Sequence, residues 1–279
     1  MIQVLKPIIN PSSEKLIIAT AKDLPQSLLL SGDKGVGLST IAKYMCSLCK
    51  VKPTVILPEK DEKIDLEAGI ISVDIMRRLY EDTRSKHSSK QIIIIDYAER
   101  MTQQAQNAFL KLLEEPGLGV YFILVTNSIS KLLPTIVSRV KIINIKPIST
   151  EQTNEFLDLL KIDDKTKRSQ LLFMAGGLPA ELSRLNNDEK YFEARSVIIR
   201  DARELLSGSI YRKLLIAQKY KDNREAVLLL LLDMSKILKL TIESNPQIET
   251  IGKIDSILET YSHIEANSNI RLALAKMIF

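Results

Sequence analysis

Short apolar runs and helical patterns alternate along the first half of the chain. Runs of strand length predict strands at residues 27–30, 54–57, 91–96, 120–126 and 141–145. The segments between them, at 39–49, 73–86 and 102–115, carry apolar residues at the spacing of amphipathic helices. Because strands that alternate with helices build parallel sheets covered by helices, we expect an α/β core.

After residue 145 the pattern becomes helical only. Ser149 and Gln152 have the spacing of a capping box, and helices are predicted at 150–161 and 165–174, with a shorter one ending near residue 185. Asn186, Asn187 and Asp188 mark a second boundary, beyond which four or five amphipathic helices follow. The predicted parts are an α/β core at 1–147, a small helical lid at 148–188 and an all-α domain at 189–279.

Composition changes this picture little. The chain has 279 residues and a net charge of +5, but acidic and basic residues are interspersed, which favours a solvated surface over a dedicated DNA groove. Aromatic residues, at 5%, are too sparse for a base-stacking platform. The start lacks a signal-peptide pattern, and the apolar run 226–232 is far shorter than the about 20 residues of a membrane span, so we expect a cytoplasmic protein without membrane contact.

The segment SGDKGVGLST, residues 31–40, matches the phosphate-binding template G-x-x-x-x-G-K-[ST] except at its lysine, where Leu38 stands. Glycines in such a loop let backbone amides converge on an anion at a helix N-terminus. Lys34 is an alternative cation, although a side chain at that position of the template is expected to point outward. We therefore expect weak or absent ATP or ADP binding and no required cofactor. The predicted nucleotide-contacting residues of this loop are Gly32, Gly35, Gly37, Ser39 and Thr40.

Asp96 follows the apolar residues 92–95 and is the expected magnesium-binding aspartate, at the end of a buried strand beside the loop. Hydrolysing P-loop motors often carry a glutamate directly after it, but here the residue is Tyr97. Glu99 is the alternative general base, although it lies beyond the strand end. Cys46 and Cys49 provide only two of the four ligands of a structural zinc site, so we expect no metal centre.

Several separate segments resemble the AAA+ clamp-loader family. These are the segments 96–101 and 106–116, which ends in Leu-Leu-Glu-Glu-Pro; 125–127 and 132–139, which ends in Ser138-Arg139; the turn 176–179; and the segment 267–274. The resemblance runs from about residue 6 to the C-terminus. It implies an AAA+-like core with a degenerate P-loop, a lid and a helical collar that holds an oligomer together. It also implies that Thr126, at the end of a strand, belongs to the residual nucleotide site.

The departures from the family pattern all lower the expected ATPase activity. Leu38 replaces the P-loop lysine, Tyr97 replaces the catalytic glutamate, and Glu181 stands where an arginine of the lid is expected. The resemblance implies a non-hydrolysing subunit whose Arg139 acts in trans on the ATP of a neighbouring subunit. It implies as partners gamma/tau-like motor subunits, delta-like subunits, the sliding clamp and, through the complex, primed DNA of the DNA polymerase III machinery.

Two other functions remain open from the sequence. The intact loop glycines, Ser39 and Asp96 favour a self-sufficient ATPase motor, against which Leu38 and Tyr97 stand. The modest positive charge favours a nucleic-acid-binding module of the same general fold. For Arg139, the alternatives to a role in trans are an ordinary surface salt bridge and an arginine packed against the sheet edge before residues 141–145.

Overall fold

The computed structural model describes residues 6–66, 68–84, 90–244 and 248–278. The chain folds as two compact units, with the boundary between Asn187 and Asp188. The first unit holds the predicted core and the predicted lid except Asp188, and the second unit holds the residues of the predicted all-α domain. In the described part of the chain no helix is long and apolar enough to cross a membrane.

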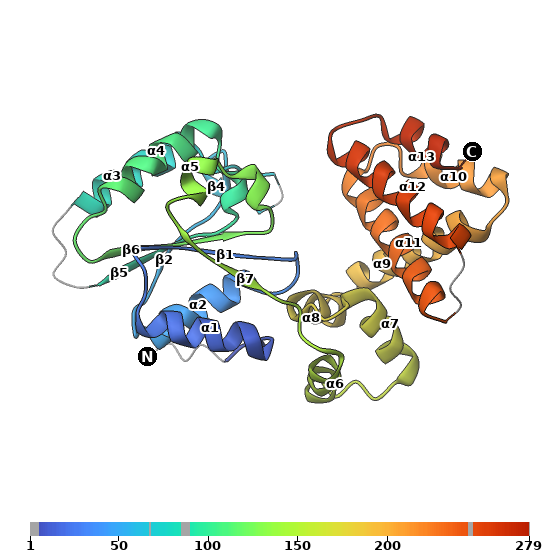
Figure 1. Cartoon of the computed structure of the whole chain (residues 1–279), viewed down its shortest axis with the longest axis horizontal. Helices are drawn as coiled ribbons and strands as arrows, with labels where there is room; N and C mark the ends of the chain where they lie inside the picture. The colour runs from blue at the N-terminus through green and yellow to red at the C-terminus, as the bar shows by residue number, and fades with distance from the viewer. Residues whose placement is uncertain (1–5, 67, 85–89, 245–247, 279) are drawn as a thin grey trace. The chain divides into compact units, whose positions relative to one another are not determined.

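A five-stranded sheet with all neighbours parallel organises the first unit, in the order β2-β5-β6-β1-β7 (Figure 1). The prediction of a parallel α/β core is confirmed. The strands differ from the predicted ones by at most two residues at an end. They are β1 Ser27–Gly32, β2 Thr54–Ile56, β5 Gln91–Ile95, β6 Val120–Thr126 and β7 Lys141–Ile145.

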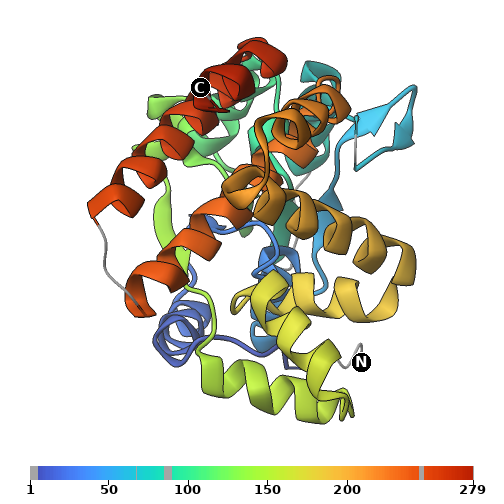
Figure 2. The same cartoon turned by 90° about the vertical axis from the view of Figure 1, so that its right-hand side faces the viewer.

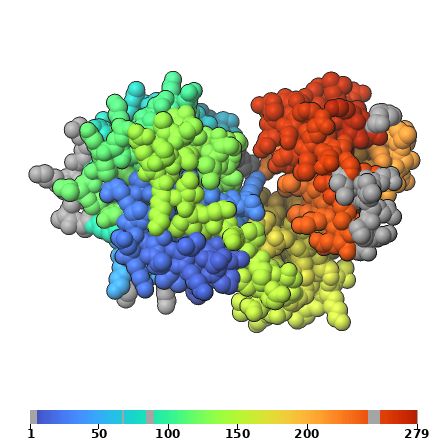
Figure 3. Space-filling view, in the orientation of Figure 1, coloured from blue at the N-terminus to red at the C-terminus, as the bar shows by residue number. Residues whose placement is uncertain are grey.

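Helices cover both faces of this sheet because successive residues of each strand point to opposite faces. Leu28 and Leu30 of β1 pack with one cluster, which includes residues of α1 and α2, whereas Leu29 packs with the cluster of α3, α4 and α5. In the space-filling view α1 (dark blue) lies at the surface of the first unit (Figure 3). The helices are α1 Pro11–Lys22, α2 Leu38–Leu48, α3 Val73–Arg84, α4 Gln103–Glu114 and α5 Pro134–Val137, with short 3-10 turns η1 Ala98–Arg100 and η2 Ile129–Lys131.

Helix α1 and the β3–β4 hairpin are among the elements that were not predicted. Helix α1 begins after Asn10, whose side chain accepts a hydrogen bond from the Ser12 amide, and Pro11 occupies its first position. The antiparallel hairpin of β3 (Glu59–Lys60) and β4 (Lys63–Ile64) extends from the core as light blue arrows (Figure 2). The predicted helix 73–86 is described over Val73–Arg84, and residues 85 and 86 lie outside the described residues.

The lid region comprises α6 Thr150–Leu159, α7 Lys165–Ala175 and α8 Pro179–Asn187. The predicted capping box is confirmed: the Ser149 hydroxyl accepts from the Gln152 amide, and the Gln152 side chain accepts from the Ser149 amide. Gln152 Nε2 also donates to Ile9 O at 3.0 Å, and Asn10 Nδ2 donates to Pro147 O at 2.8 Å. The start of the lid is thus tied to the N-terminal segment of the core.

The second unit is helical throughout its described residues, as predicted. Leu230, Leu231 and Leu274 are fully buried in its core. A buried ion pair joins two of its helices: Arg195 of α9 lies 2.8 Å from Asp233 of α11, and their side chains are 3% and 1% exposed. The helices are α9 Glu189–Ser207, α10 Ile210–Lys219, α11 Arg224–Ser244, α12 Ile248–Glu265 and α13 Ile270–Ile278.

Candidate functional site

The loop between β1 and α2 has the close approaches and backbone angles that its glycines permit. A Cβ on Gly32 would lie 2.7 Å from the Ile145 carbonyl oxygen of the adjacent strand β7. Gly35 has φ +97°, in the left-handed region where glycine is favoured, and a Cβ there would lie 2.8 Å from the Glu181 Cβ. A side chain at either position would collide with the adjacent strand or with the lid helix, so the loop requires glycine at both.

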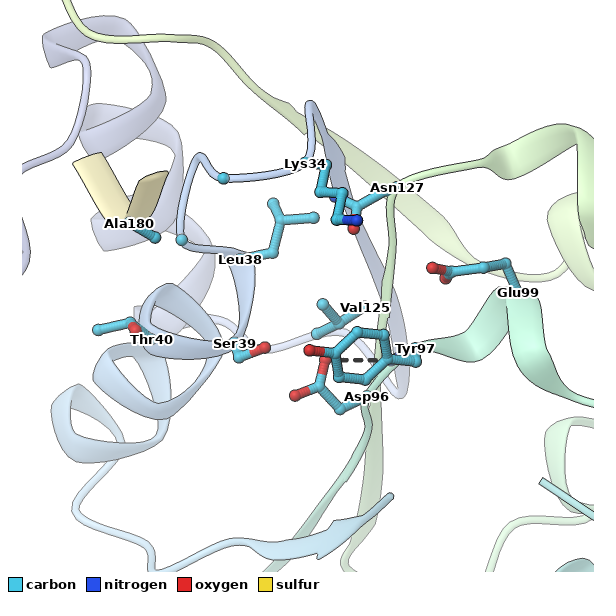
Figure 4. Close-up of a pocket in the computed structure, with 12 residues that line it drawn as sticks. Lys34, Leu38, Ser39, Thr40, Asp96, Tyr97, Glu99, Val125, Asn127 and Ala180 are labelled. Carbon is cyan, nitrogen blue, oxygen red and sulfur yellow. Dashed lines mark hydrogen bonds between the residues drawn. The ribbon is translucent and has the colours of Figure 1, made fainter. Parts of the chain in front are cut away.

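A pocket of about 200 Å³ opens beside this loop (Figure 4). It is formed by the loop, the start of α2, the ends of β5 and β6, and the first turn of α8. Of the predicted site residues, Gly35, Gly37, Ser39, Thr40 and Asp96 line it. The other residues that line it are Lys34, Leu38, Tyr97, Glu99, Val125, Asn127 and Ala180.

The predicted residues Gly32 and Thr126 do not line the pocket. The Thr126 side chain is buried, and its hydroxyl donates to Ser128 O at 3.2 Å and accepts from Ser128 N at 3.0 Å. Its neighbour Asn127, which we did not predict as a site residue, donates from Nδ2 to Gly32 O at 2.8 Å. Asn127 therefore connects the end of β6 to the phosphate-binding loop.

Ser39 and Asp96 are brought together as the sequence predicted. Burial raises the pKa of Asp96, and hydrogen bonds from the Ser39 hydroxyl and the Tyr97 amide act in the opposite direction. The distance from the Tyr97 amide nitrogen to the Asp96 carboxylate is 3.0 Å. A carboxylate and a hydroxyl placed this way are oxygen ligands of the kind that Mg²⁺ accepts beside nucleotide phosphates.

Leu38 leaves its part of the pocket without a cation. Its side chain is 5% exposed and packs in the core cluster with Val36, Ile41 and Ile145. Lys34 also lines the pocket, and its amino group lies beside Asn127 in Figure 4. Contrary to the expectation from the sequence, the Lys34 side chain lines the pocket and runs toward Asn127.

Tyr97 and Glu99 form the side of the pocket next to Asp96. Tyr97 has φ +54°, an unusual value for a residue other than glycine, and begins the 3-10 turn η1. This turn brings Glu99 back to the pocket, although Glu99 lies beyond the strand end. Within the described part of the chain, its Oε2 atom is buried and has no hydrogen-bond partner.

Backbone hydrogen bonds join the lid helix α8 to the loop. The amides of Ala180 and Glu181 donate to Gly35 O at 2.9 and 3.2 Å. The first amides of a helix have no partner within the helix, and here the loop carbonyl provides one. Ala180 is the residue of α8 that lines the pocket, so α8 contributes no arginine to the lining.

Arg139 lies outside this pocket. It directly follows Ser138, the C-cap residue of α5. Its side chain is 42% exposed. Nη1 donates to Thr135 O at 3.0 Å, and Nη2 lies 3.0 Å from Glu114 Oε1. The surface ion pair considered from the sequence is thus present, and the guanidinium remains accessible from outside the chain.

A buried glutamine, which the sequence did not single out, supports this region. Gln106 of α4 is 5% exposed. Its Nε2 donates to Met101 O at 3.3 Å and to Lys131 O at 3.1 Å, and its Oε1 accepts from Leu133 N at 2.7 Å. The sequence signal that could have identified Gln106 is its position as a polar side chain on the apolar face of a predicted helix. Gln106 fixes the segment that leads into α5 and Arg139.

The two cysteines are core residues. Burial raises the pKa of Cys46 to about 12. Cys49 follows α2 as its cap rather than lying within the helix, and its thiol donates to Ala21 O at 3.3 Å. Over the ranges that the structure describes, no group of three or more His, Cys, Asp or Glu side chains is arranged to hold a metal ion.

The sequence is similar to proteins of one known family. The family model described as DNA polymerase III, delta subunit, matches residues 10–149. The chain is 25% identical to DNA polymerase III subunit delta' of Haemophilus influenzae, over 81% of this chain and 75% of that protein. It is 30% identical to the subunit delta' of Bacillus subtilis, over 40% of this chain and 34% of that protein.

A solved structure with a similar fold is that of a DNA polymerase III gamma subunit-related protein from Thermotoga maritima. Its TM-score is 0.53 at 20% identity, and the match covers 95% of this chain and 97% of that chain. This likeness supports an AAA+-like fold with a parallel five-stranded sheet and a mostly helical C-terminal region. The family match and the two relatives place the protein in DNA replication. The chain belongs to the DNA polymerase III delta-subunit family and is a clamp-loader subunit of the delta-prime type.

Proposed function

We propose that this clamp-loader subunit hydrolyses no ATP itself and supplies Arg139 to the ATP site of a neighbouring motor subunit. The observation that carries the proposal is a contrast within the first unit. The pocket of the chain holds a neutral leucine at the position of the phosphate-binding lysine, whereas Arg139 lies outside that pocket with its side chain 42% exposed.

Arginine has the chemistry for this role. Its guanidinium is planar, stays charged at physiological pH and can contact two phosphate oxygens at once. Charge develops on the transferred phosphoryl group during hydrolysis, and an arginine supplied by a neighbouring subunit stabilises it. The proposed partners are a gamma/tau-like motor subunit and a delta-like subunit in the cytoplasm, with the sliding clamp and primed DNA as the objects of loading.

The pocket has a residual role in this proposal. The lid is held to the loop by the hydrogen bonds from the Ala180 and Glu181 amides to Gly35 O, which are contacts within the chain itself. We therefore propose that the subunit needs no bound ATP or ADP to keep its first unit in one arrangement, and that it binds either nucleotide weakly.

A self-sufficient ATPase is the second candidate, and one observation favours it. Lys34 and Glu99 both line the pocket that holds Ser39 and Asp96, so a cation and a carboxylate are present there in other positions. Glu99 follows Asp96 by three residues and lies on a 3-10 turn rather than on the strand. The two candidates differ in whether the chain alone hydrolyses ATP.

We expect the purified chain alone to hydrolyse ATP at no more than the background rate. Losing a charge-assisted phosphate contact costs about 1.5–3 kcal/mol, and losing a positioned base costs about 10²–10⁴ in rate. The measurement is phosphate release with Mg²⁺ and ATP, with and without the clamp and primed DNA. Turnover that disappears in both Asp96→Asn and Glu99→Gln would establish the second candidate.

Replacing Leu38 with lysine should raise nucleotide affinity about tenfold to a hundredfold without producing turnover. The loop already provides amides and glycines, so the added ammonium group supplies the missing charge-assisted contact. Titration with a fluorescent nucleotide and Mg²⁺ measures the change. Leu38→Met is the matched control, because methionine has an unbranched side chain like that of lysine but carries no charge, and it should leave affinity unchanged. If Leu38→Lys binds no better than Leu38→Met, the loop does not hold phosphate in the P-loop manner.

A further inference from the structure

One residue of the Leu-Leu-Glu-Glu-Pro run, Glu114, lies next to Arg139. Glu114 is the last residue of α4, and Glu115 caps that helix. The Glu114 Oε1 atom lies 3.0 Å from Arg139 Nη2. One carboxylate of the run thus contacts the side chain to which we assign a role in trans.

A second contact fixes the same guanidinium from another direction. Arg139 Nη1 donates to Thr135 O at 3.0 Å, so its two terminal nitrogens are held by different elements, α4 and α5. An arginine side chain has five N–H donors in a planar fork. One of them donates to Thr135 O, and the Glu114 carboxylate forms an ion pair with the guanidinium at Nη2.

Helix α4, which carries Glu114, is hydrogen-bonded to the segment that leads into α5, which carries Thr135. Gln106 of α4 bonds to the backbone of Lys131 and Leu133, directly before α5. Glu114 lies at the C-terminal end of the same helix α4, and Thr135 lies in α5. The helix that carries Glu114 and the segment that leads into Thr135 are therefore connected to each other through Gln106.

The exposure of the pair indicates what it does. The side chains of Arg139 and Glu114 are 42% and 53% exposed, and ion pairs at such exposure add little to folding stability. A flexible arginine that is oriented before it meets a phosphate loses less conformational entropy on binding. The effect of Glu114 should accordingly appear in the reaction and not in the stability of the fold.

We propose that Glu114 is a positioning residue, which holds the Arg139 guanidinium ready for the phosphate of a neighbouring subunit. The inference rests on the proposed role of Arg139 in trans. It gives the first glutamate of the Leu-Leu-Glu-Glu-Pro run a task that its neighbour Glu115 does not share.

The test compares Glu114→Gln, Glu114→Ala and Glu115→Ala in the reconstituted complex with the motor and delta-like subunits, the clamp and primed DNA. Glu115 is the matched control because it is adjacent, exposed and of the same charge. We expect kcat for ATP to fall about two- to fivefold in Glu114→Ala, the range that corresponds to a half-exposed ion pair. Glu114→Gln keeps an acceptor oxygen and should fall less. Glu115→Ala should retain the full rate, and all three variants should share one melting temperature within about 2 °C.

A double variant separates the failure of this inference from the failure of the proposed function. If Glu114 acts through Arg139, then Glu114→Ala should cause no further loss in the Arg139→Ala background. An equal loss in both backgrounds, a higher rate in Glu114→Ala, or an effect no larger than that of Glu115→Ala would overturn the positioning role. If Arg139→Ala itself leaves the rate of the complex unchanged, the proposed function fails instead.

Discussion

Arg139→Ala should lower ATP hydrolysis at the adjoining motor site by about 10³–10⁵-fold while the complex still assembles. The side chain is 42% exposed, so its removal should cost the free energy of unfolding no more than about 1 kcal/mol. Single-turnover hydrolysis in the presence of clamp and primed DNA measures the rate, and gel filtration measures assembly. Clamp loading should fall with hydrolysis.

Arg139→Lys is the informative control for this result. Lysine keeps the positive charge but presents a single ammonium group in place of a planar fork, so it should restore only part of the rate. Full activity in Arg139→Lys would show that charge alone suffices at this position. An assembled Arg139→Ala complex with normal hydrolysis and loading would leave Arg139 as an ordinary surface residue.

Arg195→Met should lower the free energy of unfolding of the second unit by about 3–5 kcal/mol, because it leaves the Asp233 carboxylate buried without its main partner. The two side chains form two hydrogen bonds, at 2.8 and 3.2 Å, and are 3% and 1% exposed. Lys236 lies 3.9 Å from the same carboxylate and compensates only in part. Urea unfolding followed by circular dichroism measures the change.

Two further variants show whether the lost ion pair causes this change. Arg203→Met alters an exposed arginine of the same helix and should change stability by no more than about 0.5 kcal/mol. Arg195→Met combined with Asp233→Leu removes both charges and should recover most of the loss. If the double variant is as unstable as Arg195→Met, the pair acts through packing and not through its charges.

The sheet could be predicted because its strands are almost wholly apolar. Residues 92–95 are all isoleucine and buried, and strands of this kind occur in parallel sheets covered on both faces. The hairpin β3–β4 gave no such signal, because it is short and its residues 59–63 are all charged. Its formation depends on contacts with the rest of the core, such as the bridge between Glu59 and Ile70.

The sequence predicted which residue types form the candidate site, but it did not predict the hydrogen bonds and side-chain directions that join them. Ser39 and Asp96 followed from a motif and a strand end, and the structure places them in contact. The direction of the Lys34 side chain and the link from Asn127 to Gly32 depend on the fold of the loop, which no periodic pattern encodes. The contact between Glu114 and Arg139 likewise joins two segments that only tertiary packing brings together.

The most direct test of the role in trans compares two variants of this chain within the reconstituted complex. Asp96→Asn changes the pocket of the chain, and Arg139→Ala changes the surface that we assign to the neighbour. We predict that clamp- and DNA-stimulated ATP hydrolysis is unchanged in Asp96→Asn and lost at the adjoining site in Arg139→Ala. The opposite result, with hydrolysis lost in Asp96→Asn and unchanged in Arg139→Ala, would contradict a subunit that acts only on the ATP of its neighbour.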